Sequence, residues 1–198
     1  MIPPLMRTNN PNNIVYLDIE TTGLSLSQGA RICEIAMLKV SDGIETTFNQ
    51  LINPNQLMPE LCSKIHGITD DMLKDSPKFA DVAQEVANFI DGFVLICHNA
   101  SFDLNFISKE IMENYIQPPE MYFIDTLTIS RQYFSFSSNK LGNIAEILDI
   151  EVKEQHRAMA DVLTMQSISK YLFNNLYRKG IDTLEPSYFE QSLTYPTI

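Results

Sequence analysis

The segment 14–24, IVYLDIETTGL, decides the fold of this chain. Its first four residues are apolar, which is typical of a strand buried within a sheet. Asp18 and Glu20 follow this run, and side chains two residues apart on a strand point to the same face. The segment therefore predicts two carboxylates side by side at the end of a buried strand.

Adjacent carboxylates in a half-buried position repel one another unless a cation or a proton neutralises them. A hard divalent metal with oxygen ligands meets this need, although an isolated Asp-x-Glu is also common at a solvated strand end. The next residues, Thr21, Thr22, Gly23 and Leu24, offer hydroxyls, backbone N–H groups and an apolar side chain. Such a loop suits the sugar and phosphate of a nucleotide. An ordinary turn would explain the glycine but not the carboxylates.

Two later segments carry similar groups. In HNASFDLNF, residues 98–106, Asp103 falls in the first turn of a predicted helix, just beyond an apolar strand. Open α/β sheets bind ligands at such strand ends, but an aspartate there also complements the helix dipole. His98 and Asn99 are expected to shape the loop and to support the ligands from behind.

In HRAMAD, residues 156–161, His156 lies in a polar segment and Asp161 on the helix that follows. A histidine that titrates near neutral pH can accept a proton from an attacking water. A surface histidine near a helix start is the alternative.

The remaining pattern predicts an α/β fold. Strands at 31–40 and 45–52, joined by a Ser-Asp-Gly turn, form an antiparallel meander with the first strand, and strands at 92–97 and 121–124 then alternate with helices. Helices are predicted at 79–90, 102–115, 140–148 and 158–176, with another beginning near Asp125. The expected architecture is a mixed five-stranded sheet flanked by helices.

Composition restricts the class of protein. The 198 residues, 44% of them hydrophobic, predict one domain over 13–178, after a flexible segment 1–12 and before a loosely packed tail 179–198. No stretch approaches the ~20 apolar residues of a membrane span, so we expect a soluble cytoplasmic protein without a membrane partner. Three cysteines without a Cys-x-x-Cys pair indicate neither disulfides nor a zinc knuckle. The net charge of −11 argues against extensive contact with duplex DNA.

DIETTGL, HNASFD and HRAMAD, in this order, resemble the defining motifs of the DEDDh exonucleases, the DnaQ-like 3′-5′ exonucleases. The resemblance covers about residues 13–175 and implies a ribonuclease H-like fold. ETTGL, the IHGI loop and IDTL are most similar to the proofreading epsilon subunits of bacterial DNA polymerase III.

The resemblance implies that Asp18, Glu20, Asp103 and Asp161 bind two divalent ions, Mg²⁺ or Mn²⁺, and that His156 deprotonates the attacking water. Hydrolysis would release nucleoside 5′-monophosphates from the 3′ end of single-stranded DNA. The implied substrate contacts are Thr21, Thr22, Leu24, Ile65, His66 and Phe106. For Ile65 and Phe106, a place in the core explains the pattern almost as well.

Two other functions stay open. The first is an RNA 3′-end trimming enzyme of the same family, and the second is a catalytically silent interaction module, which the full set of carboxylates disfavours. A proofreading role implies a DNA polymerase subunit or a sliding clamp as partner. Gln191–Tyr195 faintly resembles clamp-binding peptides, but an uninvolved tail explains this stretch better.

Overall fold

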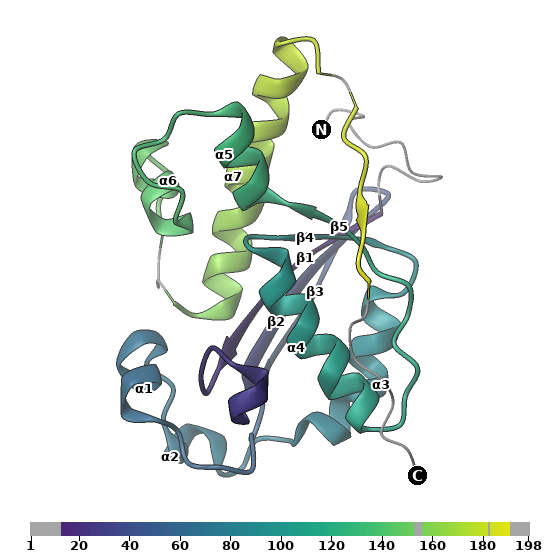
Figure 1. Cartoon of the computed structure of the whole chain (residues 1–198), viewed down its shortest axis with the longest axis vertical. Helices are drawn as coiled ribbons and strands as arrows, with labels where there is room; N and C mark the ends of the chain where they lie inside the picture. Colours follow the sequence, from purple (N-terminus) through teal and green to yellow (C-terminus); the bar gives the residue numbers. More distant parts are fainter. Residues whose placement is uncertain (1–12, 153–155, 182, 191–198) are drawn as a thin grey trace.

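The computed structural model describes residues 13–152, 156–181 and 183–190. The predicted N-terminal segment 1–12 and the Gln191–Tyr195 stretch lie outside these ranges. Within them, one mixed sheet has the strand order β3-β2-β1-β4-β5-β6 (Figure 1). Its strands are β1 (Ile14–Thr21), β2 (Ile32–Ser41), β3 (Ile44–Leu51), β4 (Val94–Cys97), β5 (Tyr122–Asp125) and β6 (Ser187–Tyr188).

The sheet combines antiparallel and parallel pairing, as predicted. β2 is antiparallel to both β1 and β3, while β4 is parallel to β1 and β5 is parallel to β4. The carboxyl ends of β1, β4 and β5 therefore lie along the same rim of the sheet. The predicted mixed α/β fold is confirmed.

The prediction of five strands is corrected by β6, which pairs antiparallel with β5 and makes a sixth. It comes from the stretch expected to pack loosely. Next to it, Phe189 is buried in the core, and its N–H donates to the Met121 carbonyl oxygen at 2.9 Å. A strand of two residues has no hydrophobic period, so sequence patterning could not reveal it.

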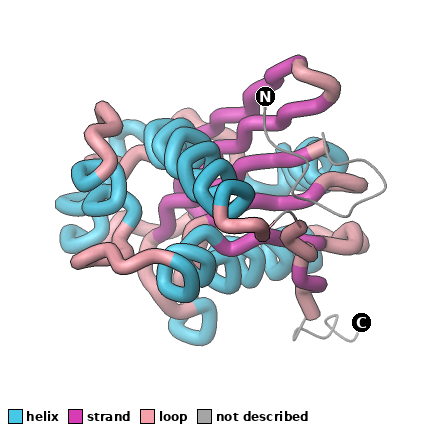
Figure 2. Tube along the Cα trace, turned by 90° about the horizontal axis from the view of Figure 1, so that it is seen from above, coloured by secondary structure: helices cyan, strands magenta, loops and turns pink. Residues whose placement is uncertain are grey.

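Helices cover both faces of the sheet (Figure 2). Their bounds are α1 (Glu60–His66), α2 (Asp70–Leu73), α3 (Phe79–Ile90), α4 (Ala100–Glu113), α5 (Thr126–Tyr133), α6 (Leu141–Ile147) and α7 (Ala158–Arg178), with a 3-10 turn η1 at Leu26–Gln28. α3 and α4 pack on one face and α7 on the other, with α5 and α6 against α7. Among the described residues, no helix combines the length and apolarity that crossing a membrane requires.

Successive side chains of β1 point to opposite faces of the sheet, and this alternation decides on which face the candidate site lies. Val15, Leu17 and Ile19 join the core beneath α3 and α4, whereas Ile14 and Tyr16 join the core beneath α7. Asp18 and Glu20 are in phase with Tyr16, so they emerge on the α7 face. A strand covered on both faces explains why its apolar residues are continuous until the first carboxylate.

Candidate active site

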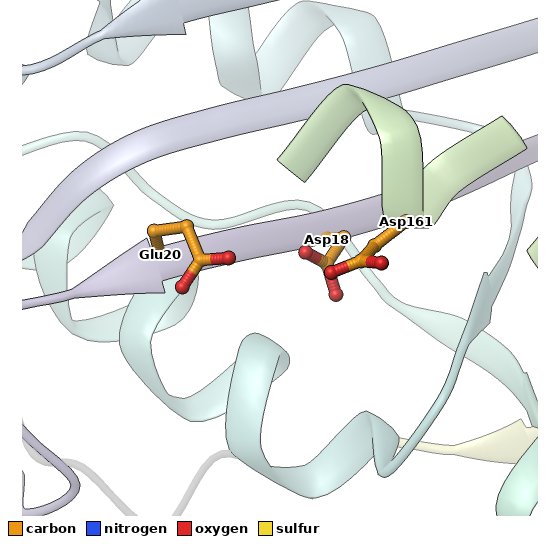
Figure 3. Close-up of side chains that lie close together, drawn as sticks. All are labelled: Asp18, Glu20 and Asp161. Carbon is orange, nitrogen blue, oxygen red and sulfur yellow. The ribbon is translucent and has the colours of Figure 1, made fainter. Parts of the chain in front are cut away.

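The site is built on three carboxylates from two elements. One oxygen each of Asp18, Glu20 and Asp161 lies within 4.8 Å of the others. Figure 3 shows Asp18 and Glu20 rising from β1, with Asp161 reaching in from the first turn of α7. The long helix packs along β1 and β2, and this packing brings residues far apart in the sequence together.

Burial and mutual repulsion disfavour ionisation of the cluster. Burial raises the pKa of Asp18 well above its ordinary value, and the charges of Asp103, Asp161 and Glu20 raise it further. Burial, followed by the charge of Asp161, raises the pKa of Glu20 to about 8. These carboxylate oxygens lie close together and are costly to ionise without a neighbouring positive charge, which suits a hard divalent cation. Binding of such a cation would offset both the burial and the mutual repulsion.

Asp161 is less perturbed than its neighbours. Burial raises its pKa to about 6, while the charge of His156 and a hydrogen bond from the His156 backbone oppose the rise. His156 lies two residues before α7, exposed, with a φ of 60°. The predicted proton acceptor thus lies beside a carboxylate of the cluster and is open to solvent.

Asp103 approaches from the opposite face of the sheet, because α4 packs opposite α7. Its side chain is buried, with 3% exposed, and burial raises its pKa although backbone hydrogen bonds, including one from Ile19, lower it. Its charge reaches Asp18, but it is not among the three carboxylates within 4.8 Å. Its role as a direct ligand stays a prediction.

The loop after β1 is held by its own hydroxyls. Thr21 Oγ1 donates to the Gly23 carbonyl oxygen at 2.7 Å. Thr22 Oγ1 accepts from the Arg31 N–H at 2.9 Å and from Gln56 Nε2 at 2.6 Å. Both hydroxyls are therefore engaged in shaping the loop that was predicted to hold a nucleotide.

Two predicted substrate contacts are exposed. The Leu24 side chain is 87% exposed and Ile65 is 60% exposed. Leu24 borders a cavity of about 420 Å³, which Asn99, Phe102 and Phe106 also line. It also borders a second cavity of about 240 Å³ lined by Thr22, Gln56 and Leu57 among others. Leu24 therefore forms part of the wall of both cavities.

His66 and Phe106 are buried instead. His66 Nδ1 accepts from the Ile68 N–H at 3.1 Å, its Nε2 lies 4.0 Å from Cys33 Sγ, and burial lowers its pKa. Phe106 is 2% exposed and packs against Phe102 with ring centroids 4.9 Å apart. Their contact with substrate stays a prediction, and Phe106 lines the cavity of about 420 Å³ that Leu24 also borders.

His98 and Asn99 organise the loop before α4. His98 Nε2 donates to the Asn139 carbonyl oxygen at 2.8 Å, and its Nδ1 lies 2.9 Å from Thr126 Oγ1. Asn99 adopts a left-handed conformation with φ 79°, and its N–H donates to Asp125 Oδ1 at 2.9 Å. These contacts tie the start of α4, and hence Asp103, to β5 and α5.

Sequence reasoning missed an ion pair beside the cluster. Glu34 on β2 is 2% exposed, and its Oε1 accepts from Arg157 Nη2 at 2.8 Å. A lone carboxylate within the apolar stretch RICEIAMLKV was the available signal, because a buried charge requires a partner. The identity of that partner was not available from local sequence.

A ribonuclease H-like sheet with clustered carboxylates at its rim defines a class of metal-dependent hydrolases. The family model for the RNase T type of exonuclease matches residues 15–168, and the chain belongs to this DnaQ-like exonuclease family.

Three similar proteins illustrate the family. DNA polymerase III subunit epsilon of Buchnera aphidicola subsp. Schizaphis graminum is 37% identical over 180 residues, covering 85% of this chain and 74% of that protein. The 3′-5′ exonuclease DinG of Bacillus subtilis is 34% identical over 154 residues, covering 77% of this chain but only 16% of that protein. The nuclease domain of 3′hExo, a DEDDh family member solved bound to rAMP, shares the fold with a TM-score of 0.70 and 19% identity, covering 91% of this chain and 97% of that one.

Proposed function

We propose that this protein is a metal-dependent 3′-5′ exonuclease that hydrolyses single-stranded DNA ends to nucleoside 5′-monophosphates. The observation that carries the proposal is the cluster of Asp18, Glu20 and Asp161, with His156 beside it, in a chain of the exonuclease family. All five residues that define the DEDDh pattern are present in the sequence.

The carboxylates supply the ligands. Asp18, Glu20 and Asp161 would hold divalent ions, two in number and either Mg²⁺ or Mn²⁺, with Asp103 contributing directly or through water. When bound, such ions offset the negative charge of the scissile phosphate and of the oxygen that leaves it.

The other residues bind substrate and move a proton. Exposed His156 would accept the proton of the attacking water at an imidazole nitrogen. The loop that contains Thr21 and Thr22 would hold the terminal nucleotide, with Leu24 and Ile65 against its base and sugar. Apolar contact with bases tolerates any sequence, so we expect little base specificity.

DNA is the favoured substrate because the epsilon subunit, whose name assigns it to a DNA polymerase, is similar over most of both chains. The same likeness supports a polymerase subunit as a partner. The RNA alternative is supported by the nuclease domain that was solved with a ribonucleotide.

A comparison of matched oligonucleotides tests the proposal. DNA and RNA strands of one sequence, labelled at the 5′ end, are incubated with the protein and Mg²⁺ or Mn²⁺, with Asp161→Asn as the inactive control. We expect stepwise shortening from the 3′ end, release of mononucleotides, and faster cleavage of DNA. Equal or faster RNA cleavage would overturn the DNA assignment. If no mononucleotide is released and Asp18→Ala leaves nucleic-acid binding unchanged, the silent interaction module is favoured.

A further inference from the structure

Glu34 connects the sheet to the start of α7 through three hydrogen bonds. Arg157 donates from Nη2 to Glu34 Oε1 at 2.8 Å and from Nε to Oε2 at 3.2 Å, which is the parallel fork of a bidentate pair. The Ala158 N–H donates to the same Oε2 at 3.0 Å. Glu34 therefore holds both a side chain and a backbone group of the segment that enters the helix.

The held segment lies between two residues of the site. Arg157 is the N-cap of α7, directly after His156, and its carbonyl oxygen accepts from the Asp161 N–H at 3.0 Å. Arg157 makes no side-chain cap to its own helix. Glu34 supplies that cap from β2, because a carboxylate satisfies a free N–H at a helix start and complements its partial positive charge.

We propose that Glu34 is a positioning residue for catalysis. By holding Arg157 and Ala158, it fixes where α7 enters the site and so sets His156 and Asp161 against the carboxylates of β1. A misplacement of about 1 Å in a catalytic group can lower a rate by about 10²-fold. The inference rests on the proposed exonuclease function.

The chain contains a matched control pair. Arg31 Nε donates to Glu110 Oε1 at 2.8 Å, and the exposed side-chain fractions are 32% and 3%, against 32% and 2% for Arg157 and Glu34. Glu110 lies on α4, on the other side of the sheet from α7. Loss of either glutamate charge removes one buried arginine–carboxylate interaction, although Arg31 keeps a second ion pair with Glu113 at 2.8 Å. Of the two glutamates, Glu34 is the one that holds the start of α7.

The experiment compares Glu34→Gln with Glu110→Gln by steady-state hydrolysis of single-stranded DNA and by amide hydrogen exchange of the metal-free proteins. For Glu34→Gln we expect kcat to fall by roughly 30-fold or more with KM within about threefold, since substrate groups are untouched. Exchange over residues 156–161 should become faster. Glu110→Gln should keep kcat and exchange in this segment near the wild-type values.

Two results would overturn the proposal: an equal fall of kcat in both variants, which indicates a general loss of stability, or unchanged exchange over 156–161 in Glu34→Gln. If Glu34→Gln does not fold, Arg157→Lys replaces it, because lysine keeps the positive charge but removes the bidentate fork. Arg157→Lys should then lower kcat and make exchange over residues 156–161 faster, whereas Glu110→Gln should change neither. Wild-type protein without hydrolysis would contradict the proposed function, whereas the exchange data would still decide whether Glu34 anchors α7.

Discussion

Glu20 on β1 lies directly opposite Glu34 on β2 in the antiparallel register. Both side chains project on the α7 face, yet their surroundings differ. Glu34 is paired with Arg157, whereas the pKa of Glu20 is raised to about 8, chiefly by burial. The register thus places a carboxylate that is paired with an arginine directly opposite one that the proposed function assigns to a cation.

Removal of a carboxylate of the cluster should lower activity strongly and leave the fold intact. Asp18→Asn or Asp161→Asn is expected to lower hydrolysis by at least about a thousandfold, because several kcal/mol of charge stabilisation depend on these ligands. The metal-free variants should melt at or above the wild-type temperature, since a neutral side chain relieves repulsion. Circular dichroism melts check this, with exposed Asp71→Asn as the control, and gross unfolding of the variants would contradict it.

The stability of the metal-free protein should fall as pH rises. Because folding raises the pKa of Glu20 from 4.5 to about 8, the folded protein binds this proton more tightly than the unfolded chain. Stability from this group is therefore present at acid pH and is lost as pH rises through that interval.

Melting temperatures across this interval provide the measurement. Glu20→Gln should reduce the fall in melting temperature across this pH interval by at least about 2 °C. A change of ~1 kcal/mol in the free energy of unfolding produces such a shift in a chain of this size. Mg²⁺ or Mn²⁺ should also reduce it, because bound cations replace the proton. An identical decline in wild-type and Glu20→Gln proteins would show that Glu20 is not its source.

Loss of the exposed histidine should affect rate rather than binding of ions. His156→Ala is expected to lower kcat by about 10²- to 10⁴-fold, the usual contribution of a general base. Mn²⁺ binding measured by calorimetry should stay close to wild type, because His156 is not among the three clustered carboxylates. Unchanged kcat would remove its assigned role.

The exposed Leu24 should contribute to capture of the strand end. Leu24→Ala is expected to raise KM about fivefold with kcat little changed, equivalent to ~1 kcal/mol of apolar contact. Ile44→Ala is the matched control, since Ile44 is also exposed but lies at the start of β3, in the hairpin with β2. Equal KM values for the two variants would indicate that Leu24 does not contact substrate.

Phe106 should matter mainly for stability. As its ring is 2% exposed, Phe106→Ala is expected to cost about 3 kcal/mol or more and to lower the melting temperature by roughly 6 °C or more. Exposed Ile65→Ala should leave the melting temperature unchanged. A stable Phe106→Ala variant with a raised KM would instead support direct contact with the substrate.

The local sequence pattern was sufficient for prediction where one strand or one helix contains the whole pattern. The buried first strand with Asp18 and Glu20 was predictable from an apolar run and a period of two, and α3 from its helical spacing. The burial of His66 was not, since it depends on packing against Cys33 of a distant strand. Glu34 and Arg157 are 123 residues apart, so their pairing appears only when α7 docks on the sheet.

β6 has a practical consequence. Its two residues cover the outer side of β5, and Phe189 behind them fills the core beneath α3 and α4. A chain shortened to the predicted domain end at residue 178 would expose the backbone N–H and C=O groups of β5 together with an apolar hollow. Such an uncovered border invites strands of other molecules to add to it. Truncations of this exonuclease should therefore retain residues through 190 to keep the protein from aggregating.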